Sequence, residues 1–176
     1  VQRTIEEYVM KFLDIDQRNV SDNVVKLLYL EEKIQIDVQY DDFTFPIRFN
    51  GTIDRVEQRG EDIYIVDYKS GIVEKGQVAL NEKKWENLIQ DYEYSKAFQL
   101  LMYAYLLFKT GMIGEDKRVY VGNYSFRRLK LGFIGFRNGK DKDISPVDTD
   151  VRMAFEQKLL QLLKEIYDPS LPFVEK

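Results

Sequence analysis

The stretch that decides the fold is FNGTIDRVEQRGEDIYIVDYKSG, Phe49–Gly71. Its two halves are rich in isoleucine, valine and tyrosine and flank Gly60 and Glu61, a pattern that predicts a β-hairpin with a two-residue turn. Counting outward from that turn places Asp54 opposite Asp67. Directly opposed residues of an antiparallel pair have Cβ atoms about 5 Å apart, so we expect two carboxylates side by side at the open end of the hairpin.

A lysine completes this group of charges. Lys69 lies two residues beyond Asp67 and therefore on the same face of the strand. Neighbouring carboxylates repel each other unless a cation lies between them, and Mg²⁺ binds a few carboxylate oxygens while it keeps several waters. The main-chain carbonyl of Tyr68 would add an oxygen ligand. A metal-bound water beside a lysine is suited to phosphodiester hydrolysis; the alternative is a surface salt-bridge cluster at a sheet edge.

A second polar pair lies in an apolar segment, YSKAFQLLMYAYLLFKTG, residues 94–111. This segment is apolar on most faces and predicts a largely buried helix that starts near Ser95 and ends at Gly111. Gln99 and Tyr103 are spaced one helical turn apart, so they lie on one face of it. A buried glutamine needs a hydrogen-bond partner. We expect this pair either to face the aspartates or to pack within the core.

The remaining pattern predicts one α/β (α+β) domain built on a mixed β-sheet. Amphipathic spacing indicates a first helix around Phe12 and a last helix that starts near Asp148. Between them, the segments that we expect to be regular are a short helix over 24–30, a hairpin of 33–40 with 43–49, and strands over 118–126 and 129–136.

Composition narrows the chemistry. The chain has 176 residues, of which 44% are hydrophobic, enough for one domain over 1–176. It has no cysteine and no histidine, which excludes a thiolate zinc site, an iron-sulfur cluster and an imidazole base. No apolar run is long enough to cross a bilayer and the N-terminus lacks a signal-peptide pattern, so we expect a cytoplasmic protein without a membrane partner. Because Val1 leads directly into a helical pattern, we expect a fragment of a longer protein.

Three segments in this order, GTIDRVE, YIVDYKSG and QLLMY, resemble the consecutive motifs of the PD-(D/E)XK nuclease superfamily. The similarity is to its RecB-like exonuclease branch, which includes the C-terminal nuclease domains of AddB-type recombination proteins. It implies a restriction-endonuclease-like mixed sheet flanked by helices. It also implies a metal-dependent deoxyribonuclease of the exonuclease type that acts on DNA in recombination or repair, together with a helicase domain or subunit.

The same resemblance assigns roles to the residues singled out above. It implies that Asp54, Asp67 and the carbonyl of Tyr68 hold Mg²⁺ or Mn²⁺ and that Asp54, Asp67 and Lys69 are catalytic. Gln99 and Tyr103 match the QxxxY motif of the superfamily, which lies beside the active site and helps to hold the DNA backbone.

Two departures from the branch bear on activity. Its members usually present a further ligand, often a histidine, from a helix upstream of the first strand, and this chain has no histidine. We expect that this helix is missing from a C-terminal fragment, or that Glu6 or Glu7 takes its place. Several relatives enclose an iron-sulfur cluster, which the lack of cysteine excludes here. The alternative function is therefore a catalytically inactive, nuclease-like DNA-binding or scaffold module of such a complex.

Basic residues cluster in the C-terminal half, interleaved with aromatic ones. Such a series can follow a phosphate backbone and stack on bases, or it can be the solvated face of a sheet. The net charge of −4 argues against an autonomous nucleic-acid binder without excluding a local basic surface. The basic residues are Lys117, Arg118, Arg127, Arg128, Lys130, Arg137 and Lys140.

Overall fold

The computed structural model describes residues 2–22, 24–140 and 143–172. Its helices are α1 (Gln2–Asp22), α2 (Glu82–Glu86), α3 (Ser95–Lys109) and α4 (Thr149–Tyr167). Its strands are β1 (Val25–Val38), β2 (Ile47–Arg59), β3 (Asp62–Lys69), β4 (Ala79–Leu80), β5 (Val119–Ser125), β6 (Ile134–Gly135) and β7 (Arg137–Asn138). Short 3₁₀ helices are η1 (Lys75–Val78), η2 (Tyr92–Tyr94) and η3 (Phe126–Leu131).

The main sheet is mixed, as the sequence predicts. Its strand order is β1-β2-β3-β5-β6, and β4 pairs with β7 in a small second sheet. Strands β1, β2 and β3 form an antiparallel meander, whereas β3 and β5 are parallel. Parallel neighbours need a crossover connection. The segment that contains α3 supplies it, so α3 lies against the strands that carry the candidate site.

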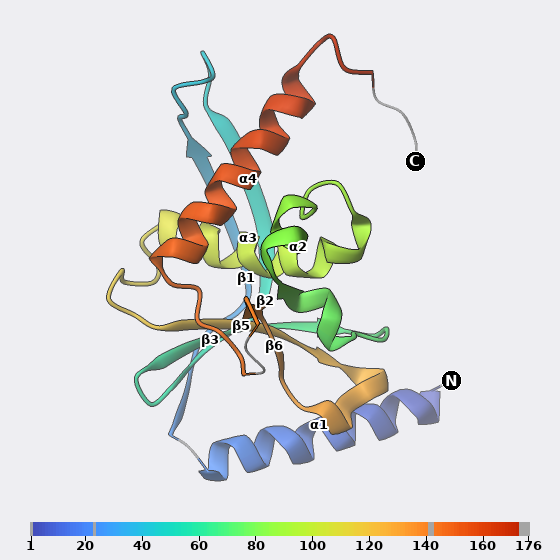
Figure 1. Cartoon of the computed structure of the whole chain (residues 1–176). Helices are drawn as coiled ribbons and strands as arrows, with labels where there is room; N and C mark the ends of the chain where they lie inside the picture. Colours follow the sequence, from blue (N-terminus) through green and yellow to red (C-terminus); the bar gives the residue numbers. More distant parts are fainter. Residues whose placement is uncertain (1, 23, 141–142, 173–176) are drawn as a thin grey trace.

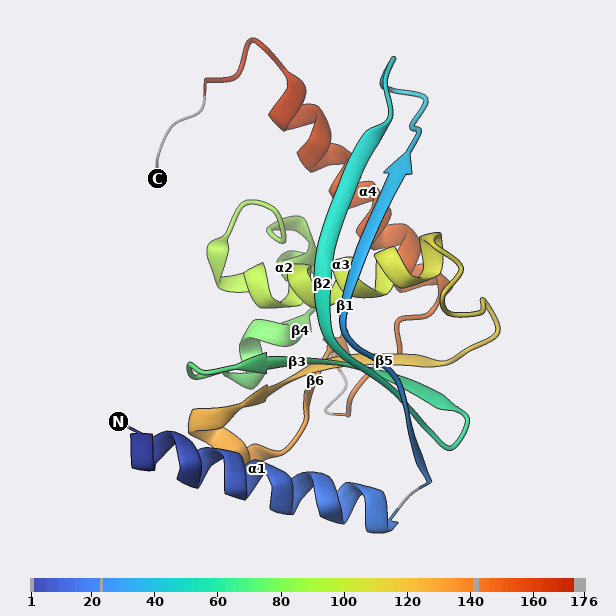
Figure 2. The ribbon, with the colours of Figure 1, turned by 180° about the vertical axis from the view of Figure 1, so that it is seen from behind.

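The helices cover the two faces of the sheet unequally. Helices α2, α3 and α4 lie on one face, and α1 crosses the other (Figures 1 and 2). On α1, Phe12 packs edge-on against Tyr68 and Tyr124 of the sheet. The neighbouring apolar residues Val9 and Leu13 are 44% and 50% exposed, so α1 covers the sheet with a narrow stripe. None of the helices in the described ranges of the chain has the length and apolar character needed to cross a membrane.

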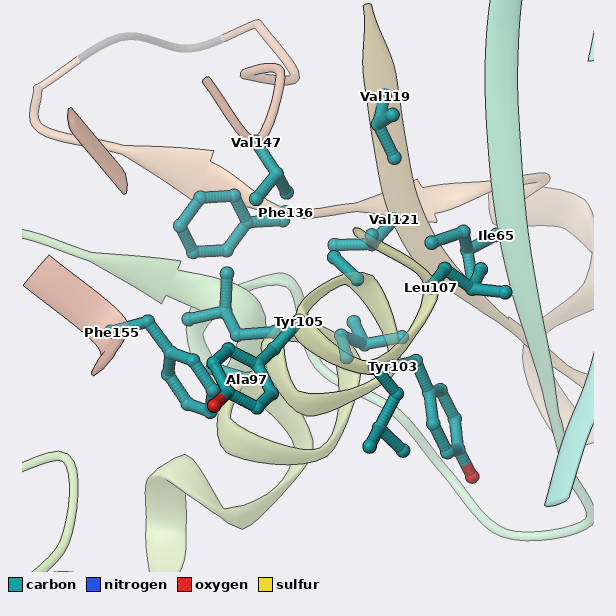
Figure 3. Packing of buried hydrophobic residues seen from close by; sticks show 14 of the residues in the cluster. Ile65, Ala97, Tyr103, Tyr105, Leu107, Val119, Val121, Phe136, Val147 and Phe155 are labelled. Carbon is teal, nitrogen blue, oxygen red and sulfur yellow. The ribbon is translucent and has the colours of Figure 1, made fainter. Parts of the chain in front are cut away.

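Helix α3 forms the centre of the core (Figure 3). Ala97, Leu100, Ala104 and Leu107 are fully buried, which explains why the segment is apolar on most faces. The helix ends at Lys109, and Gly111 follows with φ +71°, a conformation that favours glycine after a helix C-terminus. Both ends of α3 therefore agree closely with the sequence prediction.

One predicted element is wrong. Residues 24–30 are not a short helix but the first half of β1, which pairs with β2 from Val25 to Val38. The register shifts between Leu27 and Tyr29, an irregularity that brings adjacent residues to the same side. The inward-facing residues of this half of β1 are consequently spaced by three and four positions, at Val25, Leu28 and Tyr29. This spacing is the one expected for the apolar face of a helix.

The strand predicted over 129–136 is also mostly wrong. Residues Phe126–Leu131 form η3, and only Ile134–Gly135 pair with β5. The chain turns at Gly132, whose φ is +64°. Gly122 then allows β6 to approach β5, because a Cβ atom there would lie 2.7 Å from the carbonyl oxygen of Ile134. The hairpin around Gly60, the strand over 118–126 and the final helix with Asp148 as its N-cap are confirmed.

Candidate active site

The candidate site lies where the β2–β3 hairpin opens. The antiparallel ladder has the predicted register and ends at the pair Arg55 and Val66. The next two residues in that register, Asp54 and Asp67, do not continue it. Instead, Oδ2 of Asp54 accepts a hydrogen bond of 2.8 Å from the backbone N–H of Tyr68. The carboxylates therefore lie near each other, as expected, but beyond the end of strand pairing.

Asp67 is the most buried charged group of the site, with 2% of its surface exposed. Its Oδ2 lies 2.9 Å from Nζ of Lys69 and accepts a 2.8 Å hydrogen bond from Nδ2 of Asn123. Its Oδ1 accepts a longer bond of 3.3 Å from the Tyr103 hydroxyl. Burial raises the pKa of Asp67, Lys69 acts in the opposite direction, and repulsion from Asp54 raises the pKa further.

Helix α3 adds Gln99 and Tyr103 to the same group. Lys69 donates a 2.7 Å hydrogen bond to Oε1 of Gln99, and Nε2 of Gln99 lies 2.6 Å from the Tyr103 hydroxyl oxygen. Figure 3 shows that this hydroxyl points away from the labelled apolar side chains. Burial, followed by repulsion from Asp67, raises the pKa of Tyr103, so its hydroxyl stays protonated and can donate to Asp67. The four side chains thus form a closed hydrogen-bonded ring.

The oxygen donors of the site suit a divalent cation. Asp54 and Asp67 are close enough to raise the pKa of Asp67 through repulsion, and a bound cation would offset both that repulsion and the burial of charge. Among the described residues, no three Asp, Glu, His or Cys side chains are grouped to hold a metal. Two carboxylates with one main-chain carbonyl, that of Tyr68, fit an ion such as Mg²⁺ that keeps several waters.

Asn123 is a site residue that the sequence prediction missed. It is fully buried in β5 and is the ladder partner of Asp67 in the parallel pairing with β3. Its amide nitrogen holds Asp67, while its Oδ1 is buried and has no hydrogen-bond partner among the described residues. The available signal was a lone asparagine in the apolar strand VYVGNYS.

The glutamates considered as a further ligand do not reach this group. Glu6 and Glu7 are exposed on α1. That helix lies on the sheet face opposite α3, the helix that supplies Gln99 and Tyr103 to the site (Figures 1 and 2). The structure therefore does not bring the two glutamates together with Asp67.

The basic residues of the C-terminal half are also dispersed. Arg118 pairs with Asp62 at the start of β3, at 2.7 Å. Arg128 of η3 pairs with Glu74 at 2.8 Å. The two contacts lie at opposite ends of β3, so these basic residues do not form one continuous surface.

The face of the sheet beneath α1 holds a buried ionic network. Glu57 has 1% of its surface exposed and forms ion pairs with Arg55 and Arg59. Arg55 also donates to Asp16 of α1 at 3.1 Å and to the hydroxyl of Tyr68 at 3.4 Å. The strand that carries Asp67 is therefore fixed on one face by α3 and on the other by this network.

Comparison with known proteins agrees with this geometry. The family model described as the PD-(D/E)XK nuclease superfamily matches residues 1–176. Neither the curated proteins nor the solved structures gave a match. The chain therefore belongs to the PD-(D/E)XK nuclease superfamily, and its mixed sheet flanked by helices is the restriction-endonuclease-like fold of that superfamily.

Proposed function

We propose that this chain is a Mg²⁺- or Mn²⁺-dependent deoxyribonuclease of the RecB-like, AddB-type branch, which acts in recombination or repair beside a helicase domain or subunit. Membership of the superfamily implies a nuclease that hydrolyses DNA phosphodiesters, usually with a divalent metal. The branch, the exonuclease action and the helicase partner rest on the ordered motifs GTIDRVE, YIVDYKSG and QLLMY.

The observation that carries the proposal is the convergence of charge and hydrogen bonds on one carboxylate. Asp67 is buried, and the side chains of Lys69, Tyr103 and Asn123 all contact it. A buried charge that serves only structure is costly and uncommon, and strongly confined ionisable groups cluster at functional sites. The surface salt-bridge alternative is disfavoured, because a sheet-edge ion pair would leave Asp67 in contact with solvent.

The residues have distinct roles in the proposed reaction. Asp54, Asp67 and the carbonyl of Tyr68 would hold the metal, which when bound acidifies a water and polarises the phosphate. The ammonium of Lys69 stabilises negative charge that develops on a phosphate oxygen. Gln99 accepts from Lys69 at 2.7 Å and thereby fixes the direction of that ammonium.

The second candidate is an inactive nuclease-like module that binds DNA or serves as a scaffold. The observation in its favour is that the described residues group two acidic side chains at the site and no third. The site would then retain the fold and the Lys69–Asp67 ion pair without supporting cleavage.

One experiment separates these functions. Mg²⁺ and Mn²⁺ are titrated by calorimetry into the wild type, Asp54→Ala and the control Asp41→Ala, which removes an exposed acid from the β1–β2 turn. Each protein is then incubated with linear DNA and metal. Saturable metal binding and DNA cleavage that are lost only in Asp54→Ala support the proposed nuclease function. Binding without cleavage favours the inactive module, and equal metal affinity in all three proteins rejects the two-aspartate site.

A further inference from the structure

A groove of about 390 Å³ lies between α1 and η3. Its walls include two aromatic residues, Tyr8 and Phe126, and four basic ones, of which Arg128 pairs with Glu74 and the others are Lys11, Arg127 and Lys130. A second hollow of about 380 Å³ shares Lys11 and Lys130 and continues along α1. Figures 1 and 2 both show η3, in light orange, beside the N-terminal half of α1. We call the two hollows together the α1–η3 groove.

The groove concentrates positive charge in an acidic protein. Lys11, Arg127 and Lys130 are exposed, and within the described ranges none of them forms an ion pair. The second hollow adds Arg18, and its lining includes one acid, Asp14. The whole chain carries a net charge of −4, so this surface differs in sign from the rest of the molecule. Unpaired cations along a groove attract a polyanion.

The groove lies beside the strand that carries the candidate site, on the face of the sheet that α1 covers. Helix η3 starts directly after Ser125, the ladder partner of Lys69 in the parallel β3–β5 pairing. The ring of Phe126, the first residue of η3, stacks on Tyr68 with centroids 6.1 Å apart. Phe12 of α1 contacts both rings, at 5.8 Å and 5.2 Å. The groove therefore runs past the end of the strand that carries Asp67 and Lys69, on the sheet face opposite the one where α3 contacts those two side chains.

We infer that the α1–η3 groove binds the sugar-phosphate backbone of one DNA strand as it enters or leaves the candidate site, an inference that rests on the proposed nuclease function. Cations supply contacts to phosphates, and the partly exposed ring of Tyr8 provides a surface on which a base can stack. Both kinds of contact are indifferent to base sequence. Phosphates are common to single-stranded and duplex DNA, but only a single strand has unstacked bases, so the groove favours single-stranded DNA.

The test measures binding apart from cleavage. Fluorescence anisotropy of a labelled single-stranded oligothymidylate is followed in the presence of a chelator, over a range of salt concentrations. The groove variant is Arg127→Ala with Lys130→Ala. The matched control is Lys33→Ala with Lys164→Ala, which removes two exposed cations from β1 and α4. A third variant, Arg127→Lys, keeps the charge in the groove.

DNA binding in the groove would give a specific pattern of affinities among these variants. The groove variant binds about tenfold more weakly than the wild type, and the slope of log K against log salt falls by about 1.4, since each single-strand phosphate contact contributes about 0.7. The control and Arg127→Lys bind like the wild type. Equal binding by the groove variant and the control, or no binding by the wild type, overturns the inference.

A parallel cleavage assay with metal separates this inference from the proposed function. If the wild type cuts DNA and the groove variant binds DNA as tightly as the wild type, the proposed nuclease function is retained and the role of the groove is rejected. If the groove variant binds DNA more weakly than the wild type but the wild type does not cut DNA, the role of the groove is retained and the proposed nuclease function is rejected.

Discussion

The amide nitrogen of Asn123 lies 2.8 Å from Oδ2 of Asp67, and the two residues are direct partners in the parallel ladder between β3 and β5. A donor in this position stabilises the ionised form of a carboxylate that burial otherwise disfavours. Strand β5 thus contributes to the site through a neutral side chain that requires no counter-charge.

Replacement of this donor is expected to move the pH dependence of cleavage. In Asn123→Leu the ionised form of Asp67 loses a hydrogen bond, so its pKa rises and the acidic limb of the pH–rate profile shifts to higher pH. Asn123→Asp adds a third carboxylate to the site, directly beside Asp67, and shifts the limb further in the same direction. Superimposable profiles for the wild type and Asn123→Leu would show that Asn123 only fills space.

Loss of Lys69 is expected to abolish cleavage without unfolding the protein. Lys69→Ala removes the cation that we propose to stabilise the reacting phosphate, and the loss of one such preorganised group costs about 10²–10³ in rate. The side chain is 28% exposed, so the fold tolerates the change. Linear-DNA cleavage and thermal unfolding are compared with Lys164→Ala, which removes an exposed lysine from α4. Wild-type cleavage by Lys69→Ala would remove the lysine from the mechanism.

Neutralisation of Asp67 is expected to affect metal binding and stability in opposite directions. Burial raises the pKa of Asp67 above its unfolded value, so its stabilising contribution is present at low pH and lost as the pH rises through the folded-state pKa. Asp67→Asn is therefore expected to have a higher Tm than the wild type near neutral pH, by a margin that shrinks on acidification. Metal affinity falls in the same variant.

These two properties are measured separately. Calorimetry with Mn²⁺ gives the affinity, and thermal unfolding across the acidic range, without metal, gives the stability difference. Unchanged metal affinity would argue against Asp67 as a ligand, and a Tm below that of the wild type at neutral pH would contradict the sign given to its burial.

Gln99 and Tyr103 are expected to act as one unit. Gln99→Leu and Tyr103→Phe each break the hydrogen-bonded ring that holds Lys69 and Asp67, and we expect each to slow cleavage about tenfold. Because the two residues are in contact, the double variant should be no slower than the slower single one.

The chain offers a matched control for this experiment. Tyr105→Phe removes the hydroxyl of another buried tyrosine on α3, one that contacts the hydroxyl of Tyr40 at 2.6 Å, outside the candidate site. It should cut at the wild-type rate. Additive losses from Gln99→Leu and Tyr103→Phe would indicate independent roles.

The ionic network beneath α1 is expected to support stability. Glu57→Leu leaves Arg55 and Arg59, whose side chains are 13% and 14% exposed, without their shared carboxylate. Removal of one partner from a buried network costs about 3 kcal/mol or more. Urea unfolding measures this loss, with Asp37→Ala as the control, because the Asp37–Arg48 ion pair is exposed and should contribute little. A stable Glu57→Leu protein would show that the network serves another purpose.

Local patterns predict a large share of this fold. The β2–β3 register follows from the turn at Gly60, and α3 follows from an apolar segment with a glycine after its end. Such features depend on neighbours in the chain, so the sequence specifies them. The ring formed by Lys69, Gln99, Tyr103 and Asp67 also agrees with the residues singled out beforehand.

Features that depend on distant segments of the chain could not be predicted in this way. Asn123 contacts a residue 56 positions earlier, and nothing local shows that β5 lies parallel to β3. The irregularity between Leu27 and Tyr29 gave β1 a helical pattern. The aromatic cluster of Phe12, Tyr68 and Phe126 joins three elements and defines the start of the groove.

The end of the β2–β3 ladder at Arg55 and Val66 has a consequence for the backbone beside the two aspartates. Continued pairing would use the backbone of each strand for the opposite strand and leave Asp54 and Asp67 as an ordinary cross-strand pair. The ladder instead stops before the aspartates, and the backbone N–H of Tyr68 donates to the carboxylate of Asp54. A side chain thus takes the place of a missing rung, so that Asp54 is oriented by the same strand that carries Asp67 and Lys69.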